Sequence, residues 1–221
     1  IDVEAGEETL FGNDFTMDDI IWMGPQPSVA SQAAEVGVEK SAPLSQLKQV
    51  IEAAQRQGRQ VHFLPPYRHA NKLWLEELTG IRVAQLAAQV SVELIKAIVA
   101  LRSVKSALEI AEIERACDIG YEMHTTAMRM CKPGVKEQLI AGTIEGIALA
   151  HGAGVSFPTI LSMNGETLHN HYHGNLLQEG RLMLTDAGAE TNMNYCSDFT
   201  RTMPVGGRFT QRQKEVYNIV V

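Results

Sequence analysis

The chain has 221 residues, 45% of them hydrophobic and 20% charged, which is the balance of an ordinary globular protein. Its formal net charge of −7 argues against a nucleic-acid or anionic-membrane surface, and no apolar run reaches the roughly 18 residues that a membrane-spanning helix needs. Three widely spaced cysteines indicate free thiols in a reducing compartment, so we expect a cytoplasmic protein that binds neither nucleic acid nor membrane.

Residues 1–100 predict an incomplete α/β unit. Apolar positions recur with helical spacing over Leu44–Gln57 and again over Leu73–Leu78. The apolar run Val61–Leu64, which two prolines follow, reads as a short strand. These elements are too few to close a sheet, and the chain does not open with methionine. We therefore expect them to be the later part of a larger domain.

A second domain is predicted over residues 101–221, and it begins with two helices. Ser106 with Glu109 three residues later is a capping box, which predicts the start of a long helix. The sequence Lys132–Gly134 ends that helix, because it contains proline and glycine. A second helix is predicted over Lys136–Ala150 from its apolar spacing.

Strands follow the two helices. Residues 157–161 read as a strand, and residues 182–187 and 195–203 read as the two arms of a β-hairpin with a polar turn between them. Thr210 with Gln213 repeats the capping pattern and predicts a last helix. These elements place the chain in the mixed α/β class, of the α+β kind.

The hairpin carries two aspartates that are expected to face each other. If the turn is centred on Asn192, Asp186 and Asp198 are direct cross-strand partners, with Cβ atoms about 4.5–5.5 Å apart. Two carboxylates so placed repel each other unless cations lie between them. Arg201 is a poor alternative partner, because alternation places it on the opposite strand face from Asp198. The pair therefore predicts a metal site, and a metal site suggests hydrolysis. The alternative is that both are exposed carboxylates without a functional role.

Three histidines alternate shortly before the hairpin. In a strand, His169, His171 and His173 would lie on one face. Three interpretations stay open: a second metal cluster, one catalytic histidine with two bystanders, or a polar strand edge. Imidazole can donate a hydrogen bond to a developing oxyanion, which suits hydrolysis. The remaining histidines are isolated and are interpreted as structural or surface groups: His62, His69, His124 and His151.

At the hairpin the residues resemble those of a known family. Asp186-Ala-Gly-Ala-Glu190, followed by Tyr195-Cys-Ser-Asp198-Phe-Thr-Arg-Thr202-Met-Pro204, is similar to the Xaa-Pro aminopeptidase (aminopeptidase P) and prolidase family. These enzymes are metallopeptidases with the pita-bread fold. The resemblance covers about residues 100–221. Residues 1–90 look like the latter part of a creatinase-type N-terminal domain. The resemblance therefore implies a partial creatinase-type domain followed by the first half of a pita-bread catalytic domain.

The resemblance also implies roles for three residues. Asp186 would bind one of two divalent metal ions and Asp198 would bridge both, with Mn²⁺ the usual metal in the family. His169 matches the family histidine that contacts the substrate, and His171 is the competing assignment. The implied substrates are peptides with proline at the second position, and relatives are commonly homodimers. Creatinase shares the fold without the metal, and the presence of both aspartates counts against that branch.

One departure from the family pattern concerns the remaining metal ligands. The family also uses a histidine and two glutamates that follow the hairpin. Here no histidine follows His173, and Glu215 is the only acidic residue after Asp198. We therefore expect an internal section of a Xaa-Pro aminopeptidase that is inactive by itself. The alternatives are a prolidase (Xaa-Pro dipeptidase) and a non-catalytic relative that binds peptides or proteins.

Overall fold

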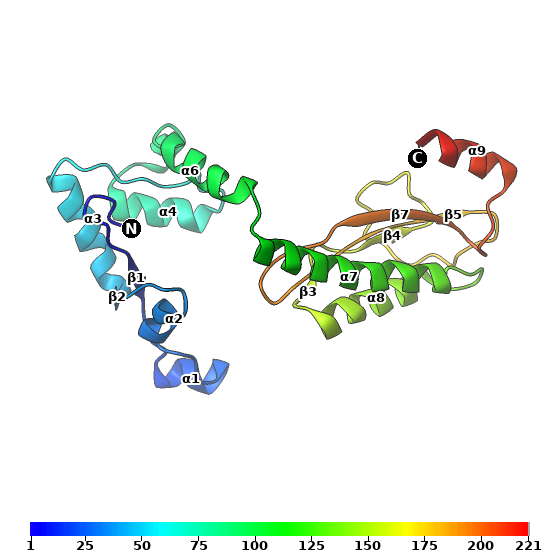
Figure 1. Ribbon diagram of the computed structural model, residues 1–221, viewed down its shortest axis with the longest axis horizontal. Helices are drawn as coiled ribbons and strands as arrows, with labels where there is room; N and C mark the ends of the chain where they lie inside the picture. Colours follow the sequence, from blue (N-terminus) through cyan, green and yellow to red (C-terminus); the bar gives the residue numbers. More distant parts are fainter. Residues whose placement is uncertain (221) are drawn as a thin grey trace. The chain divides into compact units, whose positions relative to one another are not determined.

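The computed structural model describes residues 1–220 and divides after Ser103 into two compact units, each described by itself below (Figure 1). The sequence predicts this division after residue 100. Both units combine helices with small sheets, and this confirms the mixed α/β class. Within residues 1–220 no helix is both long and apolar enough to cross a bilayer.

The first unit is built around a short parallel strand pair. Thr9 lies opposite Lys40, and Gly12 lies opposite Pro43. Two helices lie between these strands in the sequence, as a parallel connection requires. The elements in chain order are β1 (Thr9–Gly12), α1 (Met17–Met23), α2 (Val29–Glu35), β2 (Lys40–Pro43), the 3₁₀ helix η1 (Leu44–Gln46), α3 (Leu47–Arg56), α4 (His69–Thr79), α5 (Val83–Leu86) and α6 (Val92–Ser103).

Two predicted helices of this unit are confirmed, and the predicted strand is wrong. η1 with α3 covers the first helical stretch, and α4 covers the second and ends at Gly80 in the left-handed conformation. Val61–Leu64 has no regular secondary structure. The carbonyl of Phe63 accepts a hydrogen bond from the Ser91 amide at 3.2 Å, but no strand of residues 1–220 pairs with this segment. An apolar run forms a strand only where the backbone of an adjacent strand pairs with it through hydrogen bonds.

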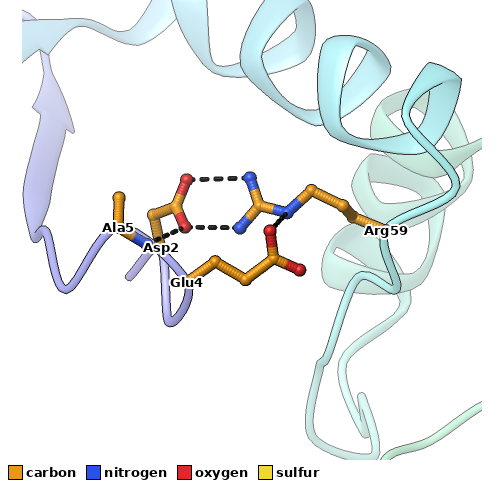
Figure 2. A network of polar contacts seen from close by, with 4 residues as sticks. All are labelled: Asp2, Glu4, Ala5 and Arg59. Atoms are coloured by element: carbon orange, nitrogen blue, oxygen red, sulfur yellow. Dashed lines mark hydrogen bonds and ion pairs between the residues drawn. The ribbon is translucent and has the colours of Figure 1, made fainter.

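Arg59 ties the first residues of the chain to the end of α3 (Figure 2). Its guanidinium binds both carboxylate oxygens of Asp2, and its Nε lies 3.0 Å from Oε2 of Glu4. Asp2 also accepts a hydrogen bond from the Ala5 amide at 3.0 Å. The Arg59 hydrogen bonds hold the pKa of the Asp2 carboxyl well below its usual range. The forked geometry is that of a bidentate pair, which fixes orientation as well as charge.

The second unit places two helices against small antiparallel sheets. One sheet has the strand order β4–β5–β7, and β3 pairs with β6 in the other. In Figure 1, α7 and α8 run side by side along the first sheet. The elements are α7 (Ala107–Met130), α8 (Glu137–His151), β3 (Gly154–Val155), β4 (Ile160–Ser162), β5 (Leu182–Ala187), β6 (Ala189–Glu190), β7 (Phe199–Pro204) and α9 (Gln211–Val220).

The predicted helices of the second unit are confirmed. Ser106 and Glu109 form the expected capping box: the Ser106 amide donates to Glu109 Oε2 at 2.7 Å, and the Glu109 amide donates to Ser106 Oγ at 3.3 Å. Thr210 and Gln213 form the same reciprocal pair before α9. Each box satisfies amide groups that the first turn of a helix leaves unpaired.

The core of this unit lies between the two helices and one face of the sheet. Met123 of α7, Ile140 of α8 and Met183 of β5 are all completely buried. Truncating a side chain of this kind to alanine costs about 2–5 kcal/mol in a protein core. The cluster also contains Ile119, Ala127, Cys131, Ile144, Ala148, Leu161, Leu177, Ala187, Ala189, Met203 and Val205. This packing presents the other face of the sheet away from the helices.

Candidate metal centre

Burial alternates along β5 and separates the two faces of the sheet. Met183, Thr185 and Ala187 are buried on the helix-covered face, whereas Leu182, Leu184 and Asp186 are only half-buried on the other. We call the face that carries these three residues the aspartate face. A hollow of about 430 Å³ lies on it, lined in part by Leu182, Leu184 and Thr202. Asp186 does not line this hollow, and its half-buried side chain lies on the face away from the helices.

The register of the hairpin differs from the prediction by two residues. Asp186 lies opposite Thr200, not opposite Asp198, so the predicted direct pairing is wrong. Glu190 lies opposite Cys196, which centres the turn on Met193 instead of Asn192. Because the difference is an even number, Asp198 keeps the same strand face as Thr200 and Asp186. The two aspartates are diagonal neighbours on adjacent strands. The Cα atoms of such neighbours are typically about 7–8 Å apart, and their Cβ atoms are somewhat closer.

The surroundings of Asp186 disfavour the charged form of its carboxyl group. Burial raises its pKa, the nearby charge of Asp198 raises it further, and a hydrogen bond with Thr200 offsets part of the effect. Its Oδ1 is buried and has no hydrogen-bond partner among residues 1–220. A buried carboxylate oxygen without a donor is costly unless it is protonated or binds a cation. Asp186 therefore holds an acceptor atom that the groups of residues 1–220 leave unsatisfied.

These observations fit a hard divalent cation. Carboxylate oxygens are the ligands that Mn²⁺ and Mg²⁺ prefer, and the aspartate face presents two carboxylates together. Within the described part of the chain, no third histidine, cysteine, aspartate or glutamate joins them in a group that could hold a metal ion. The 221 residues thus supply two candidate ligands, and a complete site of three or more needs further ones.

His124, on α7, supports the strands on either side of the aspartate pair. Its Nε2 is 3.1 Å from the carbonyl oxygen of Ala187, the residue after Asp186, and donates to it in the matching tautomer. Its ring also meets that of Phe199, the residue after Asp198, edge to face with centroids 6.2 Å apart. His124 is only 4% exposed. Its isolation in the sequence predicts a structural or surface group, although its spacing in the helix places it with the buried residues of α7.

A glycine lets the two arms of the hairpin approach closely between the aspartates. A Cβ atom on Gly188 would lie 1.8 Å from the carbonyl oxygen of Ser197 and 2.6 Å from Oγ of Ser156. Ser156 Oγ donates to that same carbonyl at 2.7 Å. The position therefore has no room for any side chain. Gly188 fixes the separation of the backbones that carry Asp186 and Asp198.

The histidine segment is a loop, so the predicted strand is wrong. Residues 167–175 contain no strand. His169 and His171 are exposed, while Nδ1 of His173 lies 2.9 Å from the carbonyl oxygen of Leu161. Within residues 1–220, neither hydrogen bond nor ion pair joins His169 to the aspartate pair, and the three histidines form no metal cluster. Of the three interpretations, one catalytic histidine with bystanders is the one we carry forward.

Known proteins resemble this chain along most of its length. The Xaa-Pro aminopeptidase of Escherichia coli (strain K12) is 33% identical over 210 residues, which are 91% of this chain and 47% of that protein. Xaa-Pro aminopeptidase 3 of Mus musculus is 28% identical over 207 residues, which are 91% of this chain and 40% of the relative. The chain thus spans about half the length, or less, of these curated relatives.

Solved structures give the same picture. Aminopeptidase P of E. coli matches with a TM-score of 0.79 at 29% identity, over 96% of this chain and 50% of that one. The aminopeptidase PepP of Pseudomonas aeruginosa has a TM-score of 0.82 at 23% identity, which shows the fold alone. The expected resemblance to the aminopeptidase P fold, over half of that protein, is confirmed. Residues 111–221 match metallopeptidase family M24, and the chain belongs to that family.

Proposed function

We propose that the protein is a metal-dependent aminopeptidase that releases an N-terminal residue preceding proline. The observation that carries the proposal is the unsatisfied, buried Oδ1 of Asp186 beside the second carboxylate of Asp198. Membership of family M24 supports a peptidase, and the similar relatives are named Xaa-Pro aminopeptidases. The proposal includes the cytoplasmic location, the homodimer and the partial creatinase-type domain expected from the sequence.

Each candidate residue has a proposed task. Asp186 would bind one divalent ion and Asp198 would bridge two, with Mn²⁺ as the proposed metal. Bound ions of this kind lower the pKa of water and polarise a carbonyl group. His169 would donate a hydrogen bond to the oxygen that gains charge, and His171 is the alternative for this role. The exposure of both imidazoles leaves them free for a substrate.

The chemistry of the substrate explains why a dedicated enzyme is useful. The bond before proline is a tertiary amide without an N–H group. A peptidase that orients its substrate through the scissile N–H therefore has no donor to hold. Polarisation of the carbonyl by metal ions does not need that donor.

We further propose that these 221 residues do not turn over substrate alone, because they hold two of the five ligands that the family uses. Two carboxylates should bind Mn²⁺ weakly, with a dissociation constant in about the millimolar range. Mn²⁺ is paramagnetic, so NMR can locate it: amide signals of residues 185–188 and 197–200 should broaden first. Asp186→Asn and Asp198→Asn should each abolish this broadening, whereas Asp118→Asn, exposed on α7, should leave it unchanged. Broadening that neither aspartate variant alters would contradict the site.

A peptide assay tests the activity. The chain alone should not cleave an Xaa-Pro-Xaa tripeptide in Mn²⁺, and robust turnover would contradict the incomplete site. A fusion that adds the second half of the E. coli relative's catalytic domain after Val221 should cleave the tripeptide, and Asp198→Asn should abolish that cleavage. Equal cleavage of a matched Xaa-Ala-Xaa peptide would refute the proline preference. Cleavage of Xaa-Pro dipeptides alone would indicate a prolidase.

A further inference from the structure

The first residue of α8, Glu137, is a carboxylate with no exposed surface. Its Oε1 accepts hydrogen bonds from the Met163 amide at 2.8 Å and from Ser162 Oγ at 3.2 Å. Its Oε2 accepts a hydrogen bond from Nδ2 of Asn175 at 2.9 Å. A carboxylate is costly to bury unless donors surround it, and here three donors do. Nothing in the proposed chemistry uses this group.

The donors come from the two ends of one segment. Ser162 is the last residue of β4 and Met163 follows it, whereas Asn175 lies beyond the three histidines. We call residues 163–175 the histidine loop. A single carboxylate thus joins the beginning of the histidine loop to its end. Closing a loop in this way removes much of the freedom that its residues would otherwise have.

Hydrogen bonds continue from Glu137 into the middle of the histidine loop. Oγ of Ser162, which donates to Glu137, accepts from Nδ2 of Asn170 at 3.3 Å and from the Asn164 amide at 3.0 Å. Asn170 lies between His169 and His171, and its Oδ1 accepts from the Tyr172 amide at 3.0 Å. The Glu137 carboxylate is therefore two hydrogen bonds away from the residue that separates the two candidate histidines.

The backbone of α8 makes the connection reciprocal. The Glu137 amide donates to the carbonyl oxygen of Asn175 at 3.0 Å, and the Gln138 amide donates to that of His173 at 2.9 Å. These amides belong to the first turn of α8, where a helix has no internal acceptors of its own. Carbonyl groups of the loop thus accept the hydrogen bonds of the first helical turn, and the carboxylate of Glu137 accepts those of the loop.

We propose that Glu137 is a positioning residue that holds the histidine loop, and with it His169 and His171, in one conformation. The role of the histidines rests on the proposed function; the anchoring rests only on the contacts above. Glu137→Leu removes every acceptor at this position. Glu137→Gln keeps one acceptor for Met163, and its amide can pair with that of Asn175 once the latter is turned around.

Amide hydrogen exchange, measured by NMR on the full chain, tests the proposal. Relative to the amides of β5, exchange at Met163, Asn164 and Tyr172 should accelerate about tenfold or more in Glu137→Leu. The ring signals of His169 and His171 should shift as well. Glu137→Gln should restore most of the protection. Glu145→Gln, on an exposed position of the same helix, should behave as the unchanged chain does.

Two results would overturn the proposal. In one, exchange in the histidine loop rises only in step with that of β5, which would make Glu137 a general support of the unit. In the other, neither the loop amides nor the histidine rings respond. If Glu137→Leu does not fold, Asn175→Ala removes one anchor from the loop side and should give the same local acceleration. Because no readout uses metal or peptide, failure of the peptidase proposal would leave this result intact, and the reverse holds too.

Discussion

The hydroxyl of Tyr195 donates a hydrogen bond to Oε1 of Glu109 at 3.0 Å, joining residues 86 positions apart. Glu109 is the capping-box residue of α7, and Tyr195 closes the turn of the aspartate hairpin. Hydrogen bonds from Ser106, followed by the one from Tyr195, hold the pKa of Glu109 below its ordinary value of 4.5. The tip of the hairpin and the beginning of α7 therefore share one carboxylate.

Tyr195→Phe should destabilise the second unit at neutral pH and do so less in acid. A carboxyl group whose pKa is lowered by folding contributes stability above its unfolded value, and this contribution is lost as the pH falls through the folded value. Urea unfolding at pH 7 and pH 4 measures the difference between the two chains. Tyr121→Phe, on an exposed side chain of α7, is the control. An equal loss at both pH values would show that the hydrogen bond to the charged carboxylate is unimportant.

Gly188→Ala should disrupt the hairpin. The new methyl group would lie 1.8 Å from the carbonyl oxygen of Ser197, so the strands must separate. We expect the unfolding free energy to fall by more than about 3 kcal/mol. Gly142→Ala, at an open position of α8 with no atom within 4 Å, should instead stabilise the chain by about 0.5–1 kcal/mol. Denaturant unfolding followed by circular dichroism compares the two, and similar values would refute the close approach.

His124→Leu should cost about 0.5–1.5 kcal/mol of unfolding free energy, because it removes the hydrogen bond between the buried imidazole and the buried carbonyl of Ala187. It should also weaken the broadening by Mn²⁺ at residues 185–188, since the backbone after Asp186 loses its support. His151→Leu is the matched control: that side chain is exposed at the end of α8, and its 3.8 Å contact with Glu122 should contribute about 0.5 kcal/mol or less. If the His124 variant were as stable as the control, His124 would not support the backbone that carries Asp186.

Arg59→Ala should release the first residues of the chain from the first unit. The Ala5 and Glu7 amides, which donate to Asp2 in the folded unit, should lose protection from hydrogen exchange. Arg59→Lys should restore little of it, because an ammonium cannot bind both carboxylate oxygens in the forked geometry. Arg56→Ala, one turn earlier and exposed, should have no effect on these amides. Unchanged protection in Arg59→Ala would mean that the network in Figure 2 does not hold the terminus.

The helices of the second unit were predictable because their signals are local. A capping box such as Ser106 with Glu109 acts within one turn, and nothing distant has to agree with it. The histidines were not predictable in the same way. Alternating side chains suit a strand, but Asn170, in the middle of the segment, donates to Ser162, which donates to Glu137, and both of these residues lie outside the segment. A non-local hydrogen bond leaves no periodic pattern to recognise.

For the candidate site, the shared face of the two aspartates was predictable, whereas the exact register and the contact of His124 were not. That Asp186 and Asp198 share a face follows from their even separation in a hairpin, whichever even register is adopted. The actual register depends on the turn, where Asn194 adopts a left-handed conformation with φ of 62° and binds Glu190 through its side chain. His124 was missed because its partner is a backbone carbonyl 63 residues away.

The even register of the hairpin has a consequence for how its length can vary. One extra residue between Asp186 and Gly188, or between Ser197 and Thr200, would shift the pairing register of the hairpin by one residue. The strand side chains that follow it would then point to the opposite face of the sheet, and an acidic side chain would face the core. Additional residues are harmless only at the apex, residues 191–195, where they enlarge the turn and leave the ladder intact. Within the hairpin, insertions for labelling or tethering this protein therefore belong at the apex.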